Sequence, residues 1–152
     1  MDISALKKNE WPSPNIPGVV WTYRVPGIAL KNELRQMAAR PFAGEKIQAG
    51  KLNTDALMSA ELNIEVLTRI SADMAMTAFR TCVLSVTGLE VDGLPVDLGR
   101  YMTEQHIGGF NIKALSDAVF DEIGVGPVAD DIADIGIFLR ESCSLSESKK
   151  KS

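Results

Sequence analysis

Hydrophobic and polar residues follow no regular period over residues 1–17, which contain three prolines. This stretch predicts an irregular N-terminal arm. The β-branched and aromatic residues from Gly18 to Val25 predict one short strand, which ends at Pro26 and Gly27. Because proline cannot donate a ladder hydrogen bond, we expect the strand to stop there or to lie at a sheet edge, where it could accept a partner strand.

Helical spacing follows the strand. A helix is predicted over residues 28–40, with Leu30, Leu34 and Met37 on one face and a proline directly after it. Residues 41–53 contain two glycines and few large apolar side chains, so we expect a loop there.

A long helix is predicted next, from Asn53 or Thr54 to about Leu84. Its charged residues recur every four positions and mark a solvent-facing stripe: Glu61, Glu65, Arg69 and Asp73. The apolar residues across from this stripe are expected to face the core: Leu67, Ile70 and Met74. The apolar run after Ala75 also fits the beginning of a strand, so the end of this helix stays open.

The clearest local signal is Asp92-Gly93 between apolar residues, which predicts a β-hairpin with a type I′ turn near residues 89–96. Further helices are expected from Asp97 to about Ile107, from Asn111 to Ile123 and from Pro127 to Cys143. Residues 144–152 are polar apart from one leucine and predict a flexible C-terminal tail.

These elements predict an α+β fold that is mainly α-helical. We expect a single globular domain over residues 18–143, between the irregular arm at 1–17 and the flexible tail at 144–152. The β structure of this predicted domain is limited to the short N-terminal strand and the hairpin near 89–96.

Composition narrows the possible functions. The chain has 152 residues, of which 45% are hydrophobic, enough for a core that needs no metal or disulfide. Its 16 basic and 20 acidic residues give a net charge of −4, which argues against a general phosphate-binding surface. Apolar runs are too short to span a membrane, and residues 1–10 lack the apolar segment of an export signal. We therefore expect no nucleic-acid partner and no membrane partner.

Candidate catalytic residues are few. His106 is the single histidine, and we expect it at a helix end or on the surface. Cys82 and Cys143 lie too far apart for the usual zinc patterns. Cys82 is expected to be a buried structural thiol, whereas Cys143 is a candidate for an exposed one. One histidine cannot supply the nucleophile, base and orienting group of a catalytic site, so we expect no enzyme activity, no cofactor and no metal.

Two further motifs have simpler explanations than a ligand site. Asp130, Asp131 and Asp134 suggest a cation site, but negative charge at the positive end of the last helix explains them better. Gly124-Val125-Gly126 follows no predicted strand and lacks a third glycine, so it is not a dinucleotide-binding fingerprint.

Possible partner-binding residues are aromatic residues and methionines. Trp21 and Tyr23 lie two positions apart and share one face of the predicted strand, which is either core or a docking surface. Met58, Met74 and Met76 lie on the long helix, and methionine adapts to irregular interfaces. Filling of the core is the favoured role for these methionines.

The order of several short segments resembles the tail assembly chaperones, or minor tail assembly proteins, of long-tailed bacteriophages. The segments are the opening MDISALK, the strand VVWTYRV, the run RTCVLSVTGLEVDGLPV and the ending SCSLSESKKKS. The likeness covers most of the chain as a layout. Its most specific parts are the valine-rich run that leads into Val91–Val96 and the Ser-Leu-Ser-Glu sequence of the tail, and neither is a catalytic motif.

The resemblance implies a largely helical, non-enzymatic protein in the cytoplasm of the infected host cell. It implies binding to the tape measure protein and recruitment of tail tube subunits, followed by departure before the virion matures. Members of this family often have a longer, frameshifted product, and the lysines at 149–151 fit a slippery adenine run.

One competing function stays open beside this one. A permanent virion component of the tail, neck or baseplate would use the same strand and N-terminal arm to bind a neighbouring subunit. Either function is compatible with self-association of the chain. The two differ in whether the protein is present in the mature virion.

Overall fold

The computed structural model describes the backbone of residues 8–40 and 54–151, and side chains within residues 9–40 and 64–143. In chain order the elements are β1 (Lys8–Pro12), β2 (Val20–Arg24), α2 (Ile28–Ala39), α3 (Thr54–Cys82), β3 (Val83–Thr87), β4 (Glu90–Val91), β5 (Leu94–Pro95), the 3₁₀ helix η3 (Leu98–Tyr101), β6 (Met102–Ile107), β7 (Phe110–Leu115), α4 (Ala118–Ile123) and α5 (Pro127–Lys151). The strands form three antiparallel sheets, with the orders β1-β2-β3, β4-β5 and β6-β7.

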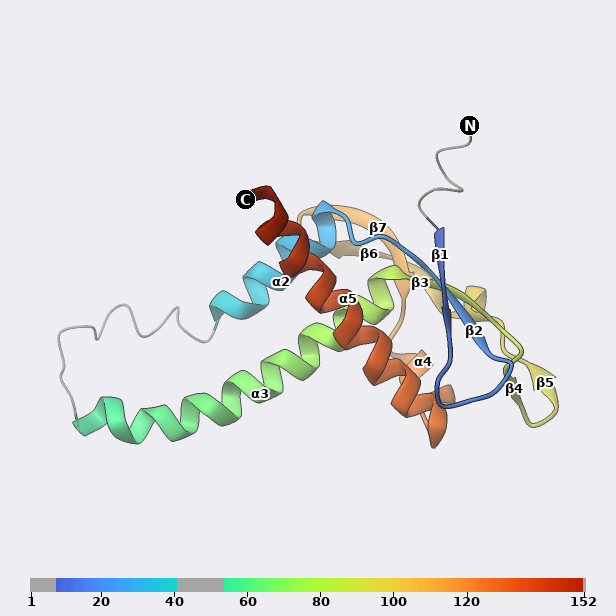
Figure 1. Ribbon diagram of the computed structural model, residues 1–152, viewed down its shortest axis with the longest axis horizontal. Helices are drawn as coiled ribbons and strands as arrows, with labels where there is room; N and C mark the ends of the chain where they lie inside the picture. The colour runs from blue at the N-terminus through green and yellow to red at the C-terminus, as the bar shows by residue number, and fades with distance from the viewer. Residues whose placement is uncertain (1–7, 41–53, 152) are drawn as a thin grey trace.

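Helix α3 is the longest element and organises the molecule (Figure 1). Its 29 residues span about 43 Å at the usual helical rise. Helix α5 crosses α3, while the sheets and α4 gather around the C-terminal end of α3 (Figure 1). The N-terminal half of α3 extends away from them. The chain therefore has a packed body at one end and a projecting helix at the other.

The core lies where α3, α5 and the β1-β2-β3 sheet meet. Trp21 and Phe79 are fully buried there, with ring centroids 5.6 Å apart in an edge-on arrangement. Phe120 of α4 also contacts Phe79, at a centroid distance of 5.9 Å. The buried face of α5 has the helical spacing that its sequence indicates, with Ile132, Ile135 and Leu139.

The predicted fold class was wrong in its β content. The chain is α+β, but its described residues form seven strands in three sheets, not one strand and one hairpin. The largest error is at residues 102–115, which were predicted as parts of two helices and form the β6-β7 hairpin. Gly108 and Gly109 have φ of +58° and +90° in the two-residue turn between Ile107 and Phe110. Adjacent glycines suit such a turn as well as a helix end, so the local sequence did not distinguish a hairpin from two helices.

The N-terminal region also differs from the prediction. Residues 8–12 of the supposedly irregular arm form β1, which pairs with β2 so that Trp11 lies opposite Trp21. Strand β2 is therefore the centre of its sheet and offers no free edge to a partner strand.

The two longest helices end at positions other than those predicted. Helix α3 ends at Cys82 and β3 starts at Val83, so the strand interpretation of this apolar run is right from Val83 onward. Helix α5 continues to Lys151, whereas the sequence predicted a helix ending at Cys143 and a flexible tail.

The hairpin near residues 89–96 forms where the sequence placed it, as β4 and β5. Asp92 and Gly93 both have positive φ, +53° and +78°. A Cβ atom on Gly93 would meet nothing within 4 Å, so the only cost of a side chain there is backbone strain. We expect Gly93→Val to lower the free energy of unfolding by about 1–3 kcal/mol, because a β-branched residue resists positive φ.

Urea unfolding of the two proteins measures this difference. The control is Gly27→Ser, because Gly27 has a negative φ of −106° and equally open space around its Cβ position. This change should alter stability by less than about 0.5 kcal/mol. An unchanged unfolding midpoint for Gly93→Val would contradict the turn geometry.

Candidate functional site

Trp21, one of the expected partner-binding residues, belongs to the core. Its side chain is fully buried, and the indole Nε1 donates a hydrogen bond to the Asp131 carboxylate at 2.8 Å. Tyr23 is only partly buried and packs edge-on against Phe138 of α5, with ring centroids 5.7 Å apart. Of these two aromatic residues, Tyr23 alone retains surface for a partner.

Asp131 has a structural role that the sequence interpretation missed. Its carboxylate is fully buried and accepts one bond from Trp21 and another from the Asn15 amide nitrogen Nδ2, at 2.7 Å. The same amide reaches Asp134 at 3.2 Å. These bonds tie β2 and the segment before it to the first turns of α5. The Asp131 carboxylate thus anchors β2 and the segment before it to α5, in addition to any interaction with the α5 dipole.

The two thiols belong to the same hydrophobic core cluster, whereas the histidine lies on the surface. Burial raises the pKa of the Cys82 thiol to about 12, and the nearby Arg24 charge offsets this only in part, so the thiolate is scarce at neutral pH. Cys143 is buried as well, which corrects its candidacy as an exposed thiol. His106 lies exposed on strand β6, not at a helix end, with Nδ1 3.1 Å from Oδ1 of Asn111.

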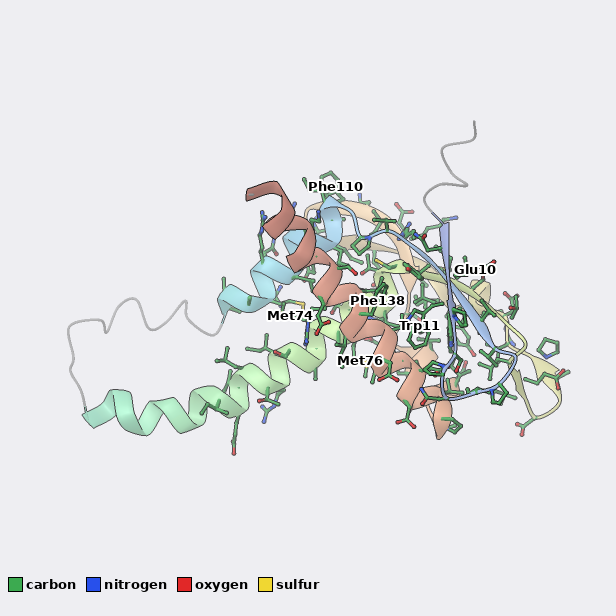
Figure 2. The ribbon with its side chains drawn as sticks, viewed as in Figure 1. Glu10, Trp11, Met74, Met76, Phe110 and Phe138 are labelled. Carbon is green, nitrogen blue, oxygen red and sulfur yellow. The ribbon has the colours of Figure 1, made fainter. Side chains whose placement is uncertain are left out.

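Met74 and Met76 of α3 do not share one surface. Met74 is partly buried and Met76 is exposed, and Figure 2 shows them on different sides of the helix. This follows from their spacing, since residues two apart on a helix point about 200° from each other. Met58 is in the N-terminal part of α3, and its side chain lies outside the described residues.

Two separate hollows lie beside helices α2 and α3, with volumes of about 140 and 350 Å³. They share no lining residue, and only the first is also bounded by α5. The first hollow is lined by Lys31, Leu34, Arg35, Ala38, Met74, Arg140 and Cys143, and the second by Met37, Arg40, Val66, Ile70 and Asp73.

Exposed apolar side chains lie on the projecting part of α3. Ile64 is 64% exposed, Leu67 41% and Val66 37%. Leu67 was expected to face the core, but α5 crosses α3 further along, near Ala75, and leaves it uncovered. Ile64 and Leu67, three positions apart, share one face of α3, whereas Val66 points to another face. Exposed apolar residues that share a face mark interaction surfaces more often than isolated ones do.

Four basic side chains line the two hollows: Lys31, Arg35 and Arg140 line the first, and Arg40 lines the second together with Asp73. Arg40 forms an ion pair with the Glu33 carboxylate at 3.5 Å. Arg140 donates to the Ser71 carbonyl at 2.9 Å, which fixes its guanidinium across α3 and α5. Arg40 and Arg140 therefore already have partners within the chain.

A third, apolar hollow of about 300 Å³ lies near the start of α2. Exposed Val25, Ile28 and Phe110 surround it, and Figure 2 shows Phe110 at the tip of the β6-β7 hairpin. Its charged residue, Arg24, already donates to the carbonyls of Thr81 and Lys113. This hollow therefore offers apolar area but little charge to select a partner.

Within the described ranges, no three histidine, cysteine or acidic side chains are close enough to hold a metal ion. The helices in the same ranges include none with the length and apolar character needed to cross a membrane. Comparisons of the chain with protein-family models, with curated protein sequences and with solved structures find no match to any of them.

Proposed function

We propose that the protein is a non-enzymatic tail assembly chaperone of a long-tailed bacteriophage. In this role it binds the tape measure protein and tail tube subunits in the host cytoplasm and leaves before the virion is complete. The proposal starts from the resemblance carried by VVWTYRV, by the run that ends at Val96 and by the Ser-Leu-Ser-Glu segment. The surface of the folded chain supplies the second line of support.

The observation that supports the proposal most is the uncovered apolar side of the projecting α3. Ile64 and Leu67, which share one face of α3, stay exposed in the folded chain. An assembly chaperone needs such a surface, because it must hold an apolar client segment and release it later. An apolar face of this small extent suits reversible binding, since its contacts are fewer than those of a permanent interface.

The test is complementation of a phage that lacks this gene. We expect the wild-type protein to restore tails, and the double variant Ile64→Glu with Leu67→Glu to restore few or none. Both residues are exposed, so the charges should change stability little. Leu94→Glu is the matched control, because Leu94 is 70% exposed on the β4-β5 hairpin, and it should restore tails like the wild type.

Mass spectrometry of purified particles separates this function from the competing one. A chaperone should be missing from mature virions. Detection of the protein at a fixed copy number would overturn the proposal in favour of a structural component of the tail, neck or baseplate. Equal tail yields from the double variant and from Leu94→Glu would show that the exposed surface of α3 is not needed for tail assembly.

A further inference from the structure

We propose that two copies of the chain pair through the free edge of strand β6, with Glu104 of one copy opposite His106 of the other. The contact joins the two β6-β7 hairpins into one continuous antiparallel sheet across a two-fold axis. It is independent of the proposed function, because it follows from the backbone of the hairpin and from two exposed side chains.

The hydrogen-bond pattern of the hairpin determines which backbone groups of β6 point outward. Ile107 and Phe110 flank the two-residue turn and form a hydrogen-bonded pair, and such pairs alternate along an antiparallel ladder. The Ser116 N–H, which donates to the Tyr101 carbonyl at 2.8 Å, fits the same alternation. Three residues of β6 therefore direct their backbone N–H and C=O groups away from β7: Met102, Glu104 and His106.

The outer edge of β7 is closed, whereas the outer edge of β6 is open. On β7, Arg24 donates to the Lys113 carbonyl at 2.8 Å, and the next outward carbonyl, that of Leu115, accepts from Arg80 at 3.3 Å. Within the described residues β6 pairs with β7 alone, and Glu104 at its centre is exposed. An exposed edge with unpaired backbone groups is where a further strand can add to a sheet.

Helix α2 sets the end of the free edge at the hairpin turn. The Gly108 N–H donates to the Glu33 carboxylate at 3.0 Å, and the Gly108 carbonyl accepts from the Asn32 amide at 3.1 Å. Because both backbone groups of Gly108 already have partners, pairing with a second strand must stop before this residue. Few registers are therefore open to a two-fold pair of β6 strands.

Side-chain charge selects one of these registers. Residues directly opposite each other in an antiparallel pair share a face and lie close together. With Glu104 opposite its own copy, two carboxylates would meet, which is destabilising. With Glu104 opposite Met102 of the second copy, neither Glu104 nor His106 would face an opposite charge. With Glu104 opposite His106, the two-fold axis passes at Gln105 and the favourable pair forms twice.

The His106 ring can bind the second copy through its Nε2 atom. Its Nδ1 lies 3.1 Å from Oδ1 of Asn111, and because an amide oxygen only accepts, this nitrogen carries the proton. A second proton at Nε2 makes a donor for the Glu104 carboxylate of the other copy. The neighbouring charged groups are Glu104 and Lys113 on the same face of the hairpin and Glu33 of α2 at the turn. We therefore expect protonation of His106 to strengthen the pair.

A second copy fits this edge better than an unrelated extended chain does. The two charged residues of β6 are two positions apart, so the strand is complementary in charge to its own reversed copy. The paired stretch is short, and the area that it buries is well below the roughly 1,600 Å² of a standard stable interface. We therefore expect a weak, reversible dimer with a Kd on the order of 0.1 mM.

The first experiment removes one outward N–H group from the edge. We expect Glu104→Pro to raise the dimer Kd at least about tenfold in sedimentation equilibrium at about pH 6, because proline cannot donate to the second copy and leaves the β6-β7 bonds intact. Lys113→Pro is the matched control, since it removes an outward N–H from β7, and it should change the Kd by less than about twofold. Circular dichroism checks that both variants fold.

The second experiment tests the register with exposed charges and remains decisive if the proline variants do not fold. Glu104→Lys alone and His106→Glu alone should each raise the dimer Kd about tenfold, because each puts like charges opposite each other in both pairs. An equimolar mixture of these two variants should dimerise about as well as the wild type. In that mixed pair the introduced lysine faces the introduced glutamate, and His106 faces Glu104.

The pH dependence gives a third readout. Between about pH 8 and about pH 6 we expect the dimer Kd of the wild type to fall about fivefold, and His106→Gln to abolish this change. A chain that stays monomeric at about 1 mM and about pH 6 would overturn the proposal. A dimer that neither Glu104→Pro nor His106→Glu weakens would overturn it too, since the copies would then associate through another surface.

Discussion

Asp131→Ala should lower the free energy of unfolding by about 3 kcal/mol. The Asp131 carboxylate is fully buried and accepts hydrogen bonds from the Trp21 indole and the Asn15 amide. Alanine leaves the indole N–H buried without an acceptor and removes two bonds to a charged group. It also detaches the segment at Asn15 from α5. Urea unfolding followed by tryptophan fluorescence measures the loss.

Two further variants test whether the bond itself is responsible. Asp130→Ala changes the neighbouring, exposed aspartate and should shift stability by less than about 0.5 kcal/mol. The double variant Asp131→Leu with Trp21→Phe removes donor and acceptor together and should be less destabilised than Asp131→Ala. Equal losses of unfolding free energy for Asp130→Ala and Asp131→Ala would show that the buried hydrogen bond does not contribute to stability.

Gly136→Leu should also lower the free energy of unfolding by about 3 kcal/mol, because there is no room for a side chain at this position. Gly136 lies where α5 crosses α3, and a Cβ atom there would overlap the backbone carbonyl oxygen of Ala75. Because the obstacle is backbone, no side-chain rotation relieves it, and the two helices must move apart. Thermal unfolding by circular dichroism measures the effect.

The neighbouring residue supplies the control for this crossing. Ile137 is 40% exposed, so Ile137→Ala should cost less than about 1 kcal/mol. A melting temperature like that of the wild type would contradict the close approach of α3 and α5.

The elements that local sequence predicted well are those with their own start and stop signals. Helix α2 begins at Ile28 as expected, and α5 begins at Pro127. The β4-β5 turn follows from Asp92-Gly93 alone, because positive φ at both positions is a local requirement. The local sequence of these segments is compatible with few other conformations, so contacts distant along the chain did not change the outcome.

The errors have a common cause in contacts distant along the chain. The Gly108 turn is held by α2: the Gly108 N–H donates to the Glu33 carboxylate and its carbonyl accepts from Asn32. A Cβ atom on Gly108 would overlap the Ala29 carbonyl. Strand β1 likewise exists through its pairing with β2. The local spacing of hydrophobic residues does not reveal these distant partners.

The candidate site could be predicted only in part for the same reason. The spacing of Leu34 and Met37 and of Ile70 and Met74 identified two apolar helix faces. Spacing cannot tell which part of such a face a third helix covers. That depends on where α5 crosses, and the crossing at Gly136 leaves Leu67 exposed while it covers Ala75.

The direct passage from α3 into β3 couples the long helix to the central sheet. No residue separates Cys82 from Val83, so there is no linker to absorb a rotation. Helix α2 packs against α3 near Val66, Ile70 and Asp73, and α5 crosses α3 at Ala75. A rotation of α3 about its own axis would therefore disturb its contacts with α2 and α5 and the start of β3 together.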